Sequence, residues 1–217
     1  MKISYIGHAC FKIETKSDKD EKLIIYIDPF DKSIGLKPPK GVADLVLSTH
    51  DHFDHNYTKE LDKGFFYINN PGEYSYKGVN VKGIQTYHDE EKGRSRGLNT
   101  VYVIENEKLK VCHLGDLGHT LSQKQADEIG SIDILMIPVG GTYTINPKQA
   151  VEIVKLIEPS IIIPMHFNQK DLQLSGLEEV EKFYNELGKQ PKETVEKLNI
   201  NANNLNPEET EVIAFNK

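Results

Sequence analysis

The sequence predicts an α/β (α+β) fold with two mixed β-sheets and helices on the outer faces of the sheets. Two observations lead to this fold class. The first half of the chain is rich in short apolar runs that pair as hairpins, and the second half alternates such runs with helical patterns. Alternation of strands and helices is typical of chains that build parallel pairs into a sheet.

In the first half of the chain, apolar runs bounded by turn residues predict nine strands. Asp28 ends the third run, because the proline after it favours an extended backbone and marks the strand end. Prolines and glycines between 31 and 43 predict a loop, and a short helix is predicted over 56–62. The strands are expected over residues 2–6, 10–15, 23–27, 44–48, 65–68, 74–76, 79–86, 100–105 and 108–114.

The second half of the chain contains the predicted helices. One spans 122–130, and another begins at Asn146 as N-cap with Pro147 in the first helical position and runs to about Ile157. Ser175 and Glu178 predict a capping box for a third helix that ends at Leu187, before Gly188. Further strands are expected over 132–138, 160–165, 196–200 and 211–215.

Length and composition predict a single domain over 1–217, with enough residues for a substantial core. No apolar run approaches the ~18 residues of a membrane span, and the N-terminus predicts a strand rather than a signal peptide. Cys10 and Cys112 form no disulfide framework, so a cytoplasmic location is expected. A net charge of −7 argues against a nucleic-acid partner, and the oligomeric state cannot be inferred from the sequence.

A cluster of histidines and aspartates follows the strand predicted over 44–48. His50 and His52 stand two residues apart, which places both on one side of an extended segment, and Asp54 and His55 follow. Imidazole suits zinc, and a carboxylate with imidazole suits a second divalent ion. The alternative, an exposed polar loop, is disfavoured because a buried strand leads into the cluster.

Other polar residues also follow apolar strands. Strand ends along one edge of a sheet converge in space, so these residues are expected to meet the His50–His55 cluster. They are Asp28, His88, Asp116 and His166.

The segment Thr49–His55 matches the His-x-His-x-Asp-His signature of the metallo-β-lactamase superfamily. The order and spacing of six further segments, over residues 1 to about 168, resemble its L-ascorbate-6-phosphate-lactonase-like branch of metal-dependent hydrolases. The segments are Gly7-His8, Ile27-Asp28-Pro29, His88, His113–Gly118, Ile137–Gly140 and Pro164–His166.

This resemblance implies an αββα four-layer sandwich with a dinuclear metal site. By the family's pattern, His50, His52 and His88 would bind the first ion, and Asp116 would bridge both. The ligands of the second ion would be Asp54, His55 and His166. His113 is the alternative to His88, although its place inside an apolar strand is more typical of a core histidine.

Several residues near the predicted site have two interpretations. His8 either faces the pocket or is a turn histidine without a role, and Asp28 is expected to orient a metal ligand rather than bind metal. Tyr143, with Gly140 and Gly141, lies on a strand-end loop that could contact substrate. Arg94 and Arg96 could hold an anionic group, or they could be solvated charges on a loop.

The predicted function is a hydrolase that uses a metal-bridging hydroxide on a small ester, lactone or phosphoester. Asp54 and Asp116 are the expected catalytic residues, with Asp54 accepting a proton. Two Zn²⁺ ions per chain are expected, and Mn²⁺, Fe or Ni²⁺ would fit the same ligands.

Other functions on the same fold are a nuclease, a non-catalytic metal-binding protein and a di-iron oxidoreductase. The acidic charge and the 217-residue length disfavour the nuclease, since such nucleases usually insert an extra domain. Di-iron members typically carry a glutamate where this chain has His52. A complete set of ligand candidates argues against the non-catalytic alternative.

Overall fold

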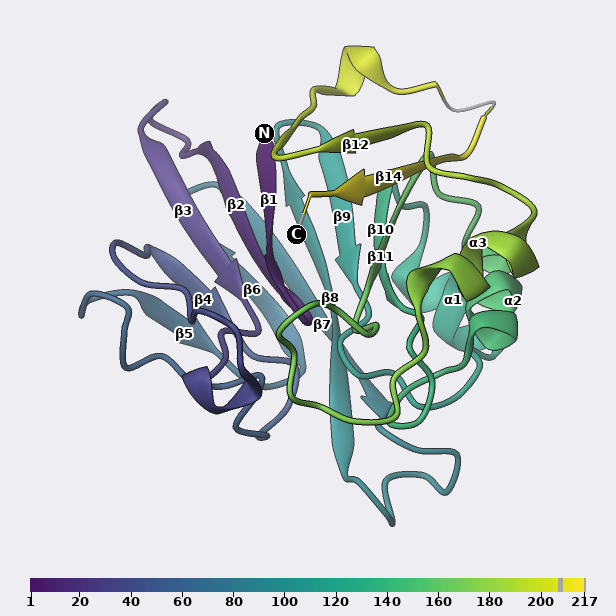
Figure 1. Cartoon of the computed structure of the whole chain (residues 1–217). Coiled ribbons are helices and arrows are strands. Elements are labelled where there is room, and N and C mark those ends of the chain that lie inside the picture. The colour runs from purple at the N-terminus through teal and green to yellow at the C-terminus, as the bar shows by residue number, and fades with distance from the viewer. Residues whose placement is uncertain (207–208, 217) are drawn as a thin grey trace.

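Two facing β-sheets form the centre of the computed structural model, which describes residues 1–206 and 209–216 (Figure 1). The first sheet has six strands in the order β13-β1-β2-β3-β4-β5, and the second has eight in the order β12-β14-β11-β10-β9-β8-β7-β6. The first sheet comprises β1 (Lys2–Gly7), β2 (Cys10–Lys16), β3 (Lys22–Ile27), β4 (Leu45–Leu47), β5 (Phe66–Ile68) and β13 (Leu198–Asn199). The second comprises β6 (Gly72–Tyr76), β7 (Val79–Tyr87), β8 (Leu98–Asn106), β9 (Leu109–His113), β10 (Ile134–Pro138), β11 (Ile161–Met165), β12 (Glu193–Val195) and β14 (Glu211–Phe215).

Both sheets are mixed, as the sequence predicts. Strands that follow one another along the chain pair antiparallel, from β1 to β3 in one sheet and from β6 to β9 in the other. Strands joined by longer connections pair parallel, as β10 does with β9 and β11. Parallel neighbours need a crossover, and α-helices supply it between β9, β10, β11 and β12.

Alternation along the strands produces separate core layers. Phe11 and Ile25 belong to the apolar cluster between the sheets, together with Tyr102 and Val111 of the second sheet. Cys10 and Tyr26, their neighbours in sequence, belong to a cluster on the outer face of the six-stranded sheet. Successive strand residues point to opposite faces, so one apolar strand contributes to both layers.

The three α-helices of the described residues cover the outer face of the eight-stranded sheet (Figure 1). They are α1 (Gln123–Ile129), α2 (Pro147–Ile157) and α3 (Val180–Leu187). Helix α2 begins as predicted, because the Asn146 side chain accepts hydrogen bonds from the backbone N–H groups of Lys148 and Gln149. This arrangement of two mixed sheets confirms the predicted fold class.

Helices were expected on both outer faces, and that detail is wrong for the six-stranded sheet. Its outer face packs against loop residues, including Phe30 and Leu61, and against Ile34 of the short 3₁₀ helix η1 (Lys32–Ile34). Pro38 and Pro39 lie in the connection between the parallel strands β3 and β4, where an α-helix would otherwise cross.

The helix predicted over 56–62 does not form. Its backbone N–H groups bond to a neighbouring loop instead: that of Tyr57 donates to the Pro29 carbonyl at 2.8 Å, and that of Asp62 to the Gly41 carbonyl at 2.9 Å. Leu61 forms an isolated bridge with Gly41. The tertiary partner therefore outweighs the weak local preference for helix.

The predicted capping box at Ser175 is also wrong, because α3 begins at Val180 and its N-cap Glu179 makes no side-chain capping bond. The backbone of Glu178 instead bonds to two neighbouring loops. Its N–H donates to the Gly140 carbonyl, and its carbonyl accepts the N–H of Asn168. The predicted C-terminus is correct, with Gly188 in the left-handed conformation.

The strand predicted over 196–200 is shorter than expected: only β13 (Leu198–Asn199) forms within it, and the separate strand β12 (Glu193–Val195) precedes it. β12 pairs with β14 in the eight-stranded sheet, and β13 pairs with β1 in the six-stranded sheet. A 3₁₀ helix, η2 (Ala202–Asn204), follows. Within the described part of the chain, no helix combines the length and the apolar character needed to cross a membrane.

Candidate metal centre

The predicted ligands come together at one edge of the two sheets, where the strands that carry them end. His8 follows β1, Asp28 follows β3, and the His50–His55 segment follows β4. From the other sheet come His88 after β7, Asp116 after β9 and His166 after β11. All seven predicted metal ligands lie in this cluster, namely His50, His52, Asp54, His55, His88, Asp116 and His166.

Asp116 lies at the centre of the cluster and is buried. Its Oδ2 lies 3.1 Å from Nε2 of His88, 3.2 Å from Nε2 of His166 and 3.3 Å from Nε2 of His55. Nε2 of His50 is 3.9 Å away. One carboxylate oxygen surrounded by imidazole nitrogens from three strand ends is well placed to bridge two cations.

The ligand atoms fall into three overlapping groups in which all atoms lie within 4.8 Å of one another. One group is His50, His52 and His88, a second is His50, His55 and Asp116, and a third is His8, His55 and His166. Asp54 adjoins the third group, with Oδ2 3.1 Å from Nε2 of His8.

His113 lies outside these groups, and both of its ring nitrogens are occupied. Nδ1 accepts the backbone N–H of Gly115 at 3.1 Å, so the proton is on Nε2, which donates to the Ala9 carbonyl at 2.9 Å. His113 therefore makes the hydrogen bonds of a core histidine, whereas His88 faces Asp116.

Asp28 and Thr49 orient two of the histidines. The Thr49 hydroxyl donates to Asp28 Oδ2 at 2.8 Å, so it can accept the Nδ1 proton of His50 at 3.0 Å. His55 Nδ1 donates to the same carboxylate at 2.9 Å. Each imidazole thus directs Nε2 to the cluster, and this is the nitrogen that binds metal once it carries no proton.

A metal fits this site because two buried ligand atoms, His50 Nε2 and Asp116 Oδ1, lack hydrogen-bond partners. Among the described residues, every buried side-chain nitrogen or oxygen without a hydrogen bond belongs to the cluster or to His8. Such atoms are costly to bury unpaired, and the donor set of imidazoles and carboxylates suits divalent metals. The ligand atoms among them are His50 Nε2 and Asp116 Oδ1, and the others are the Nδ1 atoms of His8, His88 and His166, whose Nε2 atoms face the carboxylates.

The pKa values of the cluster residues reflect two opposing effects, burial and the charge of neighbouring groups. Burial would raise the pKa values of Asp28 and Asp54, but hydrogen bonds from His55 and His8, respectively, hold both below the usual range. Burial lowers the pKa of His8 to about 4. For His55, burial is outweighed by Asp116 and Asp28, which raise its pKa. A metal ion at His55 must therefore displace a proton.

The backbone near the cluster is strained at three non-glycine residues. His8, Asp28 and His166 have φ values of 57°, 50° and 53°. This left-handed region is uncommon outside glycine, and such strain concentrates at functional sites. A hydrogen bond from the His166 N–H to the His8 carbonyl, 2.8 Å long, ties two of these turns together.

Two glycines allow the strand-end loops to approach each other. A Cβ atom at Gly118 would lie 2.3 Å from the carbonyl carbon of His88, and one at Gly140 would lie 2.1 Å from the carbonyl oxygen of His166. Larger residues would separate these loops, so the glycines are required for space.

A cavity of about 580 Å³ opens onto the cluster, a size typical of small-molecule sites. Phe53, Leu174 and Tyr143 supply its apolar wall, and Arg96 also lines it. The Tyr143 hydroxyl donates to the Ser175 carbonyl at 3.0 Å, and its ring centroid lies 6.5 Å from that of His166.

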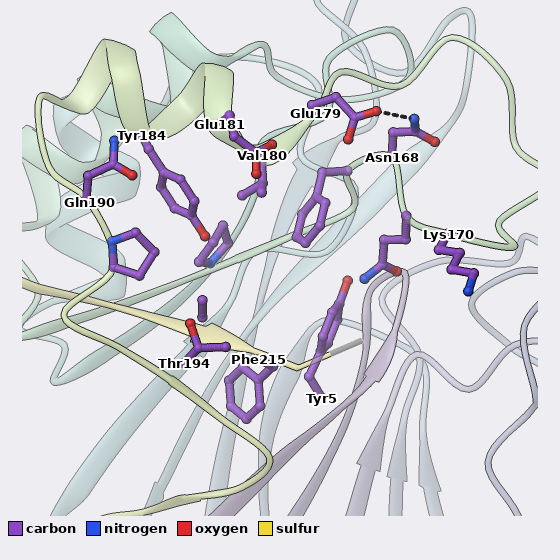
Figure 2. A pocket seen from close by; sticks show the side chains of 15 residues that line it. Tyr5, Asn168, Lys170, Glu179, Val180, Glu181, Tyr184, Gln190, Thr194 and Phe215 are labelled. Atoms are coloured by element: carbon purple, nitrogen blue, oxygen red, sulfur yellow. Dashed lines mark hydrogen bonds between the residues drawn. The ribbon is translucent and has the colours of Figure 1, made fainter.

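A second cavity, of about 430 Å³, lies away from the cluster and is shown in Figure 2. Tyr5, Tyr184 and Phe215 line it, and Asn168 donates to Glu179 at its rim. None of the predicted metal ligands lines this cavity. It therefore offers no means of activating water comparable to the metal cluster.

Sequence reasoning missed Asn99. Its side chain accepts the backbone N–H of Asp116 at 3.0 Å and donates to the Leu114 carbonyl and the Thr86 hydroxyl. Asn99 therefore fixes the turn that carries the central carboxylate. An asparagine at the start of an apolar strand was the available signal.

Comparison with known proteins identifies the family. A family model described as a beta-lactamase superfamily domain matches residues 2–166. A Thermotoga maritima crystal structure, described as a candidate Zn-dependent hydrolase of the metallo-β-lactamase superfamily, has 37% identity and a TM-score of 0.76 and covers 99% of this chain and 97% of its own. The chain belongs to the metallo-β-lactamase superfamily.

Curated relatives in this superfamily are named UPF0173 metal-dependent hydrolases. The relative from Thermoplasma acidophilum is 32% identical over 198 residues, covering 79% of this chain and 85% of its own length. That from Thermococcus onnurineus is 31% identical over 196 residues, covering 77% and 85%. The predicted superfamily is confirmed, and the predicted enzyme class, a metal-dependent hydrolase, agrees with the names of these relatives.

Proposed function

We propose that this chain is a hydrolase with two divalent metal ions, zinc by preference, that cleaves a small ester, lactone or phosphoester. The position of Asp116 carries the proposal. One oxygen of its buried carboxylate faces three imidazole Nε2 atoms within 3.3 Å, and the other has no hydrogen bond. Positive charge in the same space stabilises such a buried carboxylate, and divalent metal ions suit the imidazoles around it.

The residues that would hold the two ions come from the three groups, together with Asp54. His50, His52 and His88 would bind one ion, and Asp116 would bridge to the second. The second ion would take Asp54, His55 and His166. When bound, two such ions activate a water molecule and polarise the carbonyl or phosphoryl group that is attacked.

Asp54 is placed to take part in proton transfer. Its Oδ2 lies 3.1 Å from His8 Nε2, and its side chain is 13% exposed, so it meets both the cavity and a buried partner. His8 would orient this carboxylate and hold a proton beside it. The hydrogen bond from His8 keeps the pKa of Asp54 low, so the carboxylate stays ionised and can accept a hydrogen bond from a water molecule in the cavity.

The cavity wall favours a small substrate. Phe53, Leu174 and Tyr143 shield the cluster on its open side and would exclude bulk water from the reacting group. Such a space suits an organic ester rather than a polymer, and the net charge of −7 is unfavourable for nucleic acid.

A cytoplasmic location fits the thiols. Cys10 and Cys112 are free and buried in separate apolar clusters on opposite sides of the sheet pair. Neither belongs to the metal cluster, so the proposed site contains no thiolate.

The test combines metal content with turnover. Wild type, Asp116→Ala and His52→Ala would be compared in zinc and in manganese on a panel of esters, lactones and phosphoesters. Asp127→Ala, an exposed change on α1, is the control. Both site variants should lose metal and activity, while the control keeps both.

Other outcomes identify the alternatives. Full activity in Asp116→Ala would refute the assignment. Bound metal without turnover on the panel would favour a non-catalytic protein, and iron with reduction of oxygen or nitric oxide would favour an oxidoreductase.

A further inference from the structure

The loop after His88 is held in one conformation by Asp89. Its carboxylate accepts the backbone N–H groups of four loop residues at 2.8–3.0 Å. They are Glu91, Gly93, Ser95 and Arg96. The backbone of Arg96 is thus fixed close to a predicted metal ligand, and the loop is more than a solvated connection.

The Arg96 side chain is also fixed. Its Nη1 donates to the Thr142 carbonyl at 3.0 Å, and its guanidinium carbon lies 5.1 Å from the centre of the Tyr143 ring. Cation–π stacking of this kind sets the plane of a guanidinium. The loop 140–144 in turn is anchored through Thr142 to the Gly176 carbonyl at 2.5 Å.

The positive charge of Arg96 is not neutralised by any residue that the structure describes. Over residues 1–206 and 209–216, no carboxylate forms an ion pair with it, and one of its five N–H donors has a protein acceptor. Asp51, which lines the same cavity, is instead hydrogen-bonded to Asn56.

Arg94 provides a comparison within the same loop. It is exposed and does not line the cavity, whereas Arg96 is half-buried and does. Two arginines of one loop therefore differ in whether their charge faces the space above the metal cluster.

We propose that Arg96 forms an anion-binding subsite, so that the substrate carries a carboxylate or phosphate group away from the bond that is cleaved. This inference rests on the proposed hydrolase function, because it names the substrate class of the same cavity. The guanidinium offers donors in a planar fork that matches both kinds of anion. Phe53 and Leu174 line the same cavity and suit a short apolar linker between the anion and the scissile group.

A purely structural role for Arg96, tying the two loops together, makes a different prediction. It would lower stability and slow every substrate equally when Arg96 is replaced. The anion subsite instead requires that the loss depend on the charge of the substrate.

Matched esters separate the two interpretations. Para-nitrophenyl hexanoate is neutral, the mono-para-nitrophenyl ester of adipic acid replaces its terminal methyl with a carboxylate, and para-nitrophenyl ω-phosphonopentanoate carries a phosphonate there. Wild type, Arg96→Gln and Arg94→Gln would be assayed with metal bound. Arg96→Gln should lower kcat/KM for one or both anionic esters by about 10- to 100-fold, the range expected for a charge-assisted hydrogen bond, and leave the neutral ester nearly unchanged. The more strongly affected anionic ester identifies the anion class.

Arg94→Gln should match wild type on all three esters. Equal slowing of all three esters by Arg96→Gln, or no slowing of either anionic ester, would overturn the proposal.

A binding experiment keeps the subsite testable if no ester is hydrolysed, a result that would count against the hydrolase function alone. Metal-free wild type and both variants would be titrated with adipate and with inorganic phosphate by NMR. Weaker binding of one anion in Arg96→Gln, with Arg94→Gln unchanged, supports the subsite. Absent binding, or equal binding in all three proteins, refutes it.

Discussion

Replacing Asp28 with asparagine tests how the metal ligands are oriented. The buried Asp28 carboxylate accepts the Thr49 N–H and hydroxyl, each at 2.8 Å, and the His55 Nδ1 proton at 2.9 Å. Asparagine has the same shape but replaces one acceptor oxygen with an N–H₂ donor. If the amide oxygen continues to accept from the Thr49 N–H, the N–H₂ group faces Thr49 Oγ1 and His55 Nδ1.

The expected effect follows from the His55 tautomer. An amide donor at Nδ1 makes that nitrogen the acceptor, so the proton of the neutral ring moves to Nε2, which lies 3.3 Å from Asp116 Oδ2 and is the atom that would bind metal. Loss of such an orienting partner typically weakens metal affinity by about 10- to 100-fold, or about 1.4–2.8 kcal/mol. Asp28→Asn should show a loss of this size at one of two sites.

Competition with a chromophoric chelator measures the affinity. Asp44→Asn is the matched control: Asp44 also accepts a backbone N–H, that of Ile24 at 2.9 Å, but it lies at the opposite end of β4 from the cluster. Unchanged zinc affinity in Asp28→Asn would refute the orienting role. Equal losses in both variants would indicate general destabilisation.

Three further predictions concern other residues of the site. Burial lowers the pKa of His8 to about 4, so the unfolded metal-free chain binds more protons at this residue below about pH 6.5. Stability should therefore fall by up to about 3 kcal/mol towards pH 4, and by less in His8→Asn, as urea unfolding at several pH values will show. His88→Ala should lose one metal equivalent by elemental analysis. By contrast, His113→Ala should keep its metal and lose about 1–3 kcal/mol of unfolding free energy. If His113→Ala lost metal and His88→Ala kept it, His113 would be the ligand and His88 the core histidine. Gly140→Ala places a Cβ 2.1 Å from the His166 carbonyl oxygen, so it should cost about 1–3 kcal/mol and weaken zinc binding. If Gly140→Ala were as stable as wild type in urea, the close packing of Gly140 against the His166 carbonyl would be contradicted.

Much of the fold could be predicted because local pattern and tertiary environment agree. The Asn146-Pro147 start of α2 has both a side-chain cap and a suitable backbone, and the structure forms it as predicted. At 56–62 the two disagree, since backbone donors there find acceptors in the loop around Gly41. Such long-range partners leave no trace in a local window of sequence.

The site shows the same division. The spacing of His50, His52 and His55 indicates a metal cluster without further information. The contact between His8 and Asp54 joins residues far apart in sequence and depends on the strained turn at His8. Similarly, the orientation of Arg96 depends on Asp89 and Tyr143, which come from different loops. The sequence identifies His8, Asp54 and Arg96 as candidates, but it does not determine which way their side chains face.

We propose that the cluster around Asp116 holds two metal ions that support hydrolysis. Metal content per chain, measured by elemental analysis on the purified protein before and after chelation and alongside activity on the ester and phosphoester panel, tests it most directly. We expect two equivalents of divalent metal per chain, with hydrolysis lost on chelation and restored when zinc or manganese is returned. A protein that binds no metal, or one whose hydrolysis is unaffected by metal removal, would contradict it.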